Sequence, residues 1–123
     1  LTFFVLYLDK VDVVEVVGHT DGQELGKGFS NLDGNLEKVA IGEQDIGSLS
    51  PGSNADLGLM RALSVIQALQ KNPKLKNLKF RAYSSAQLTL PNGEFAPVNR
   101  ESDPTRRRIE IRFIRLGTVT NLK

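Results

Sequence analysis

Val13-Val14-Glu15-Val16-Val17-Gly18-His19-Thr20-Asp21-Gly22 is the stretch that decides the fold of this chain. Its valines are β-branched and would occupy both faces of an extended backbone, so residues 11–17 are predicted to form a central strand that is covered on both sides. Gly18 is predicted to end this strand. The polar residues that follow then stand at a strand end, where loops usually display the residues that act on a ligand.

The second clear element is a helix that begins near Asn54. Asn54 or the serine before it can cap the helix, and Asn72-Pro73 is expected to stop it. One apolar face runs along its length, formed by Leu59, Ala62, Leu63, Ile66 and Leu69. Arg61 lies one position off that face, near the helix start. We therefore expect the strand to deliver Asp21, and the helix to deliver Arg61, to one pocket.

Two further strands are predicted from patterns that alternate with a period of two. They cover residues 78–83 and 108–115, and in the second Ile109, Ile111 and Phe113 should face a core while Arg108, Glu110 and Arg112 face water. A loop is predicted from residue 84 to 104. Residues 1–8 fit a strand by composition and a helix by the spacing of their apolar side chains.

Between the first strand and the helix lies an insertion, residues 22–53, with seven of the chain's eleven glycines and no strong period. A short helical piece is predicted around residues 35–41. A segment of this length inside a compact domain is more often functional or mobile than filler. It could act as a lid, as a partner-binding loop or as a dimer contact.

Composition restricts the chemistry that the chain can perform. The 123 residues suit a single domain, and 40% of them are hydrophobic, enough for one core. There is no cysteine and only one histidine, so disulfides and cysteine-based zinc sites are excluded, and a Ser-His-Asp triad would depend on His19 alone. No nucleotide-binding, metalloprotease or hydrolase motif is present. These absences count against a metal site and against a catalytic triad.

Charge is distributed unevenly along the chain. Residues 1–70 hold four basic and ten acidic side chains, whereas residues 71–123 hold twelve basic and four acidic ones. The C-terminal part should therefore face an anionic partner or complement the acidic half within the fold, although solvated surface charge is an equal alternative. A nucleic-acid or phosphate-binding module would use Arg81, Arg100, Arg106, Arg107, Arg108, Arg112 and Arg115. Few aromatic residues accompany these arginines, so stacking platforms are poorly supplied.

Each candidate site residue also has a structural interpretation. Asp21 can bind a ligand cation, or it can bond the local backbone in a turn. Arg61 invites a carboxylate, which can belong to a ligand or to the protein itself. His19, as the only histidine, fits a packed and hydrogen-bonded structural role better than that of a base or a metal ligand.

The order of these motifs resembles the OmpA-like C-terminal domain, the peptidoglycan-binding module of outer-membrane porins, the peptidoglycan-associated lipoprotein and flagellar stator proteins. The resemblance covers roughly residues 11–116. It rests on the valine-rich strand, Gly18-His19-Thr20-Asp21, then Asn54-x-x-Leu57-x-x-x-Arg61-Ala62, and then Arg107-Arg108-Ile109-Glu110-Ile111. Each short motif is a weak signal, but their combination and order are specific.

The resemblance implies non-covalent binding of peptidoglycan rather than enzymatic catalysis, with no metal and no cofactor. In this family an aspartate and an arginine grip the free amino-acid end of diaminopimelate, and these roles carry over to Asp21 and Arg61. Thr20, Asn54 and Leu57 match the surrounding family positions, and Arg107 matches an arginine that lines the same pocket. The fold implied is α+β, a β-α-β-α-β sandwich with a further strand, in which helices cover one face of a mixed sheet.

Three departures from the family pattern stand out. The family serine after Leu57 is Gly58 here, so a hydroxyl is missing. Arg106 replaces an asparagine before the double arginine, which should make the pocket rim more basic. The 22–53 insertion is longer than in porin tails, so access to the pocket depends on where it folds. A protein-interaction domain with a degenerate pocket is therefore an alternative reading.

The resemblance also carries expectations about the parent protein. Residues 1–8 should be the end of the first helix, with the first strand and the start of that helix upstream and missing from this fragment. The domain should work in the bacterial periplasm and tether a membrane-anchored envelope protein, with no nucleic-acid partner. Stator-type (MotB-like) proteins of the flagellar motor are the closest in character, and dimerisation through this domain is a hypothesis.

Overall fold

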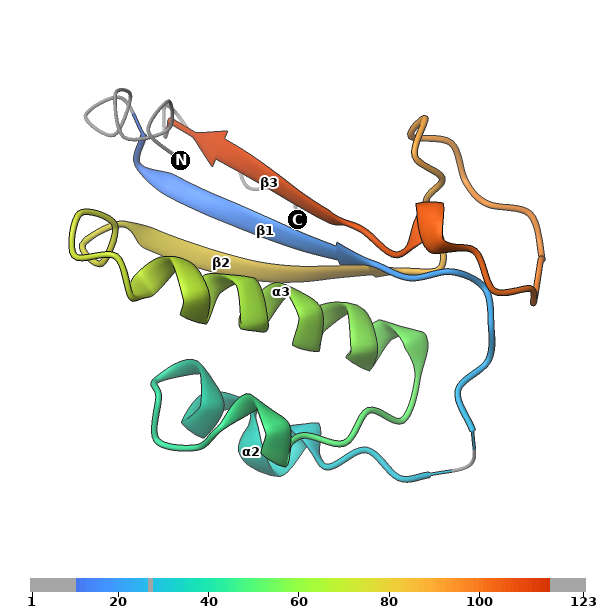
Figure 1. The fold of residues 1–123 in the computed structure, drawn as a ribbon, viewed down its shortest axis with the longest axis horizontal. Coiled ribbons are helices and arrows are strands. Elements are labelled where there is room, and N and C mark those ends of the chain that lie inside the picture. Colours follow the sequence, from blue (N-terminus) through green and yellow to red (C-terminus); the bar gives the residue numbers. More distant parts are fainter. Residues whose placement is uncertain (1–10, 27, 116–123) are drawn as a thin grey trace, which may run out of the picture.

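The computed structural model describes residues 11–26 and 28–115. Its elements are β1 (Val13–His19), α2 (Leu32–Ala40), the short 3-10 helix η2 (Ile46–Ser48), α3 (Asn54–Gln70), β2 (Lys79–Ala86), the 3-10 helix η3 (Pro104–Arg106) and β3 (Ile109–Ile114). They form an α+β domain with a small mixed sheet and two α-helices, as Figure 1 shows. The helix predicted over residues 1–8 lies outside the described residues.

The sheet has the strand order β2-β1-β3, so β1 is central as predicted. It runs parallel to β2 and antiparallel to β3. Val13, Val14, Val16 and Val17 are buried, which confirms that the strand is covered on both faces. The prediction that Gly18 ends the strand is wrong. Gly18 is paired with both neighbouring strands, and His19 is still paired with Ala86 of β2, while its N–H donates to the Arg108 carbonyl at 2.9 Å.

Helix α3 forms the main core by packing on β1 and β2. Val14 and Val16 from the sheet meet Ala62, Ile66 and Leu75 in one buried cluster. Because side chains alternate along a strand, Val17 and His19 face the opposite side of the sheet. Ile109 packs against the cluster as predicted, but Ile111 and Phe113 are 38% and 47% exposed, because α3 lies over β1 and β2 rather than over β3.

The insertion folds against the side of α3 that faces away from the sheet (Figure 1). Its helix α2 starts earlier than predicted, at Leu32, and buries Leu32 and Val39 beside Leu49. Leu59 and Met60 of α3 pack against this second cluster. The expectation of one apolar face on α3 is therefore wrong for Leu59, because α3 is covered on two sides.

Glycines bring β1 and α3 into close backbone contact near the start of the helix. A Cβ on Gly18 would collide with the carbonyl of Gly58, and a Cβ on Gly58 would lie 2.8 Å from the Gly18 oxygen and closer still to Ser84 Oγ. A serine side chain therefore has no room at position 58. This contact fixes where α3 begins relative to the end of β1.

Candidate ligand-binding site

A cavity of about 410 Å³ lies between the end of β1 and the start of α3. Three segments meet there, namely the residues after β1, the first two turns of α3 and the loop before β3. All six residues predicted to form the site line it, which are Thr20, Asp21, Asn54, Leu57, Arg61 and Arg107. The topology thus brings together side chains that lie as many as 87 positions apart in the sequence.

Asp21 is the buried anion of this cavity, with only 5% of the residue exposed. Its Oδ1 accepts the Gln23 N–H at 3.1 Å, which is the local turn expected as its structural role. Its Oδ2 accepts the Asp103 N–H at 3.0 Å and pairs with Arg107 Nη1 at 2.7 Å. Asp21 thus bonds two backbone N–H groups and also lines the cavity.

These bonds decide the charge of Asp21. Burial alone raises the pKa of the Asp21 carboxyl, but the Asp103 N–H, the Arg107 guanidinium and the Gln23 N–H together lower that pKa below its ordinary value. The side chain is therefore a carboxylate at neutral pH. An ionised carboxylate can accept about four hydrogen bonds. Three come from described residues, so room is left for one more donor.

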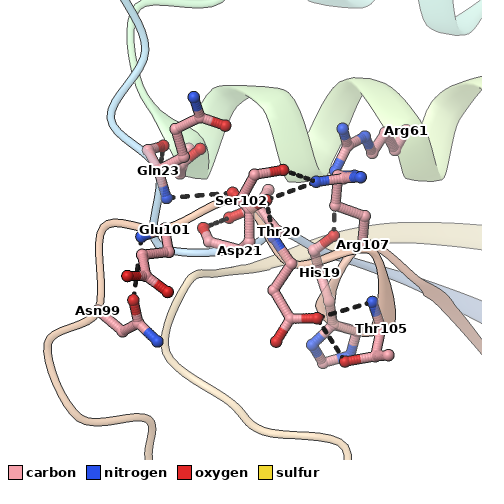
Figure 2. A network of polar contacts seen from close by, with 12 residues as sticks. His19, Thr20, Asp21, Gln23, Arg61, Asn99, Glu101, Ser102, Thr105 and Arg107 are labelled. Carbon is pink, nitrogen blue, oxygen red and sulfur yellow. Dashed lines mark hydrogen bonds and ion pairs between the residues drawn. The ribbon is translucent and has the colours of Figure 1, made fainter.

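Arg61 reaches the same cavity from α3. Its Nη1 donates to the His19 carbonyl at 3.3 Å, as Figure 2 shows. Across residues 11–26 and 28–115 no carboxylate forms an ion pair with Arg61. The internal-acid alternative for Arg61 therefore finds no support in the described part of the chain, and the guanidinium keeps donors for an external carboxylate.

Arg107 completes the charged set. Its Nη1 bonds both Asp21 and Ser102 Oγ, and in Figure 2 the three side chains converge at the end of β1. Arg106 does not line the cavity, so the expectation that it makes the rim more basic is wrong. It is 4% exposed and donates to the Gln87 carbonyl at 2.7 Å, because the turn of η3 directs neighbouring side chains to different sides.

Sequence reasoning missed several residues of the cavity wall. They are Gln23, Glu24, Leu25, Gly26 and Ser102. Asn54 Nδ2 donates to the Gln23 carbonyl at 3.0 Å, and Arg100 pairs with Glu24 at 3.4 Å. These two contacts tie the start of the insertion to α3 on one side and to the loop before β3 on the other. The glycine-rich sequence carried no periodic signal that could have located this wall.

No protein-family model, curated protein or solved structure matches this chain. Within residues 11–26 and 28–115 no group of three acidic or histidine side chains gathers as a metal site, and no helix is both long and apolar enough to cross a membrane.

The His19 side chain does not line this cavity. It is 2% exposed and lies on the opposite face of the sheet, with Nε2 3.2 Å from Glu110 Oε1, so it is packed and hydrogen-bonded as predicted. Only its backbone oxygen meets the site, through Arg61. The cavity therefore combines one buried carboxylate with two guanidinium groups, an arrangement that suits a ligand offering a carboxylate and an ammonium group close together.

Proposed function

We propose that this domain binds peptidoglycan non-covalently by holding the zwitterionic end of diaminopimelate in the cavity of Asp21 and Arg61. The ligand carboxylate pairs with the Arg61 guanidinium. The ligand ammonium donates to the remaining acceptor position of the Asp21 carboxylate. Thr20, Asn54 and Leu57 shape the walls, and Arg107 holds Asp21 ionised and adds positive charge. In this proposal the domain is a binding module of OmpA-like architecture and not an enzyme.

One observation carries the proposal. Two opposite charges line the same cavity. Arg61 has no carboxylate partner among the described residues, and Asp21 is a buried, ionised carboxylate. Glu24 also lines the cavity, but it is paired with Arg100. Among the remaining charged lining residues, Arg61 and Arg107 outnumber Asp21, which favours a ligand carboxylate. Ion pairing in a partly desolvated cavity is stronger than the same pairing at an exposed surface.

The setting follows from the ligand class. A domain that binds the cell wall would tether a membrane-anchored envelope protein in the bacterial periplasm. A stator-type parent is our first choice, and a homodimer is the associated hypothesis. Light scattering that shows a monomer at every concentration would count against dimerisation by this domain.

The nucleic-acid alternative gains little from the placement of the arginines. Arg106 is buried and Arg107 is bonded to Asp21. Arg81 and Arg112 lie on the sheet face opposite α3, on either side of Glu15. Two of the arginines on which this alternative depends are therefore engaged within the protein, which reduces the positive charge left for a phosphate backbone.

Titration of the domain with defined muropeptides tests the proposal. Isothermal calorimetry should detect a muropeptide that ends in diaminopimelate. A matched muropeptide with lysine in that position keeps the ammonium group and lacks the carboxylate, so it should bind much more weakly. Arg61→Ala should weaken binding roughly tenfold to a hundredfold, because a charge-assisted hydrogen-bonded pair is lost. Asp21→Asn should weaken it through loss of the ammonium partner.

Arg81→Gln provides the matched control, since it removes a guanidinium from the opposite face of the sheet and should leave affinity unchanged. Circular dichroism should establish that each variant is folded. Equal affinity for the diaminopimelate and lysine muropeptides, or unchanged affinity in folded Arg61→Ala, would refute the assignment.

A further inference from the structure

A second cavity, of about 420 Å³, opens on the sheet face opposite α3. Val17 and His19 of β1 line it, and they alternate with Val14 and Val16, which pack toward α3. Ser85 near the end of β2 and Thr89 in the loop after it close one side, and β3 contributes Glu110 and Arg112. This cavity shares no lining residue with the site of Asp21 and Arg61.

Two buried polar atoms on residues that line this second cavity have no hydrogen-bond partner in the described part of the chain. They are His19 Nδ1 and Arg108 Nε. Buried side-chain polar atoms are almost always bonded, so each such atom calls for an explanation. Arg108 is also weakly held elsewhere, since Nη1 lies 3.5 Å from Glu110 and Nη2 lies 3.4 Å from the Leu90 carbonyl.

The chemistry of the two atoms is opposite. Glu110 is ionised, because its hydrogen bond with Arg112 and its contact with His19 outweigh burial and lower its pKa. An ionised carboxylate can only accept, so Nε2 of His19 is the donor in their contact. Burial and the nearby Arg108 charge lower the pKa of His19, so the ring is neutral near pH 7. Nδ1 is then an acceptor without a donor, whereas Arg108 Nε is a donor without an acceptor.

The charges favour a monoanion. Arg108 and Arg112 stand against Glu110 alone, and Arg112 Nε bonds Glu110 Oε2 at 2.6 Å. Ser85 Oγ and Thr89 Oγ1 bond each other at 2.7 Å at the far side of the cavity. The excess of one positive charge therefore lies at Arg108, beside the unmet acceptor of His19.

We propose that this cavity is a binding site for a small oxyanion that carries its own hydroxyl group. Dihydrogen phosphate and a 2-hydroxycarboxylate are monoanions that share this chemistry. An anionic oxygen accepts from Arg108 Nε, and the ligand hydroxyl donates to His19 Nδ1. Sulfate and acetate are also anions, but at neutral pH neither has a hydroxyl to donate.

NMR titration of the whole chain near pH 7 separates these cases. Phosphate and glycolate are the probes, and sulfate and acetate at matched ionic strength are their counterparts without a hydroxyl. Saturable shifts of the His19 imidazole and of the amides of residues 85–93 are expected. Affinity should fall about three- to tenfold from phosphate to sulfate, or from glycolate to acetate, for the loss of one hydrogen bond. Whichever pair shows this difference identifies the source of the oxyanion.

Two variants test the site in opposite directions. Arg108→Gln should weaken binding roughly tenfold or more, because a charged donor is lost. Glu110→Gln should strengthen it roughly two- to fivefold, because the competing carboxylate is neutralised while a carbonyl remains for His19. Arg81→Gln, on the same face of the sheet but outside the cavity, should bind as the unmodified chain does.

The proposal is overturned if no probe gives saturable shifts, or if sulfate and acetate bind as well as phosphate and glycolate. Tighter or unchanged binding in folded Arg108→Gln would overturn it too. None of these results bears on muropeptide recognition, because the two cavities have separate walls.

Discussion

Gly58→Ala is expected to destabilise the domain although it removes a glycine from a helix. Alanine is favoured over glycine inside a helix by about 1 kcal/mol. The new Cβ would lie 2.8 Å from the Gly18 carbonyl oxygen and would also collide with Ser84 Oγ. Since the oxygen belongs to the backbone, β1 and α3 would have to move apart, and overpacking of this kind costs about 1–3 kcal/mol. The net loss in unfolding free energy should be about 0–2 kcal/mol.

Gly34→Ala is the matched control for this prediction. Gly34 lies in α2, it is exposed, and a Cβ there would meet nothing within 4 Å. This variant should keep the whole helical gain of about 1 kcal/mol. The two variants should therefore differ by about 1–3 kcal/mol in urea unfolding followed by circular dichroism. Equal stabilisation of both would show that β1 and α3 do not approach as described at Gly18 and Gly58.

Three further predictions concern single residues. The imidazole of His19 should titrate in NMR with a midpoint below 6.5, because burial and Arg108 lower its pKa; a midpoint above 6.5 would contradict its burial beside Arg108. A carboxyl with a lowered folded pKa stabilises the protein above its ordinary pKa and loses this contribution in acid. The difference in unfolding free energy between the native chain and Asp21→Asn should therefore shrink as the pH falls below 3.8, and a constant difference would count against the bonds of Asp21. Asn31→Ala should speed amide hydrogen exchange in residues 32–50 but not in β1, since the Asn31 side chain bonds Ser48 O at 2.8 Å and Ser50 N at 2.7 Å; unchanged exchange would mean that these bonds do not hold the insertion.

The regular elements were predictable where periodicity is strong. The apolar spacing after Asn54 gave α3, and the alternation in residues 78–83 and 108–115 gave the cores of β2 and β3. Strand ends were not predictable in the same way. Gly18 in β1 and residues 84–86 in β2 have weak strand preference, and the pairing of the two parallel strands carries them into the sheet.

The placement of the candidate site residues was largely predictable, but their partners were not. Motif order placed Asp21 and Arg61 together, because a strand end and a helix start can be read from sequence. The choice of Arg107 rather than Arg61 as the ion-pair partner of Asp21 depends on the loop before β3. Arg106 and Arg107 look alike in sequence, yet one is buried against Gln87 and the other faces the cavity. Their different positions follow from the backbone of η3, in which Arg106 is the last residue and Arg107 is the C-cap.

The insertion illustrates how packing can settle what sequence leaves open. Residues 23–26 form one wall of the Asp21 cavity, tied to α3 by Asn54 and to the loop before β3 by Arg100. Residues 28–53 of the insertion do not line that cavity, and from Leu32 onward they pack on the side of α3 that faces away from the sheet. A segment with its own buried cluster against α3 would have to break that cluster in order to close over the ligand. The insertion is therefore better suited to brace α3 and shape the cavity rim than to act as a lid. A bracing segment should show slow amide hydrogen exchange in residues 32–50, whereas a lid that opens should show fast exchange there.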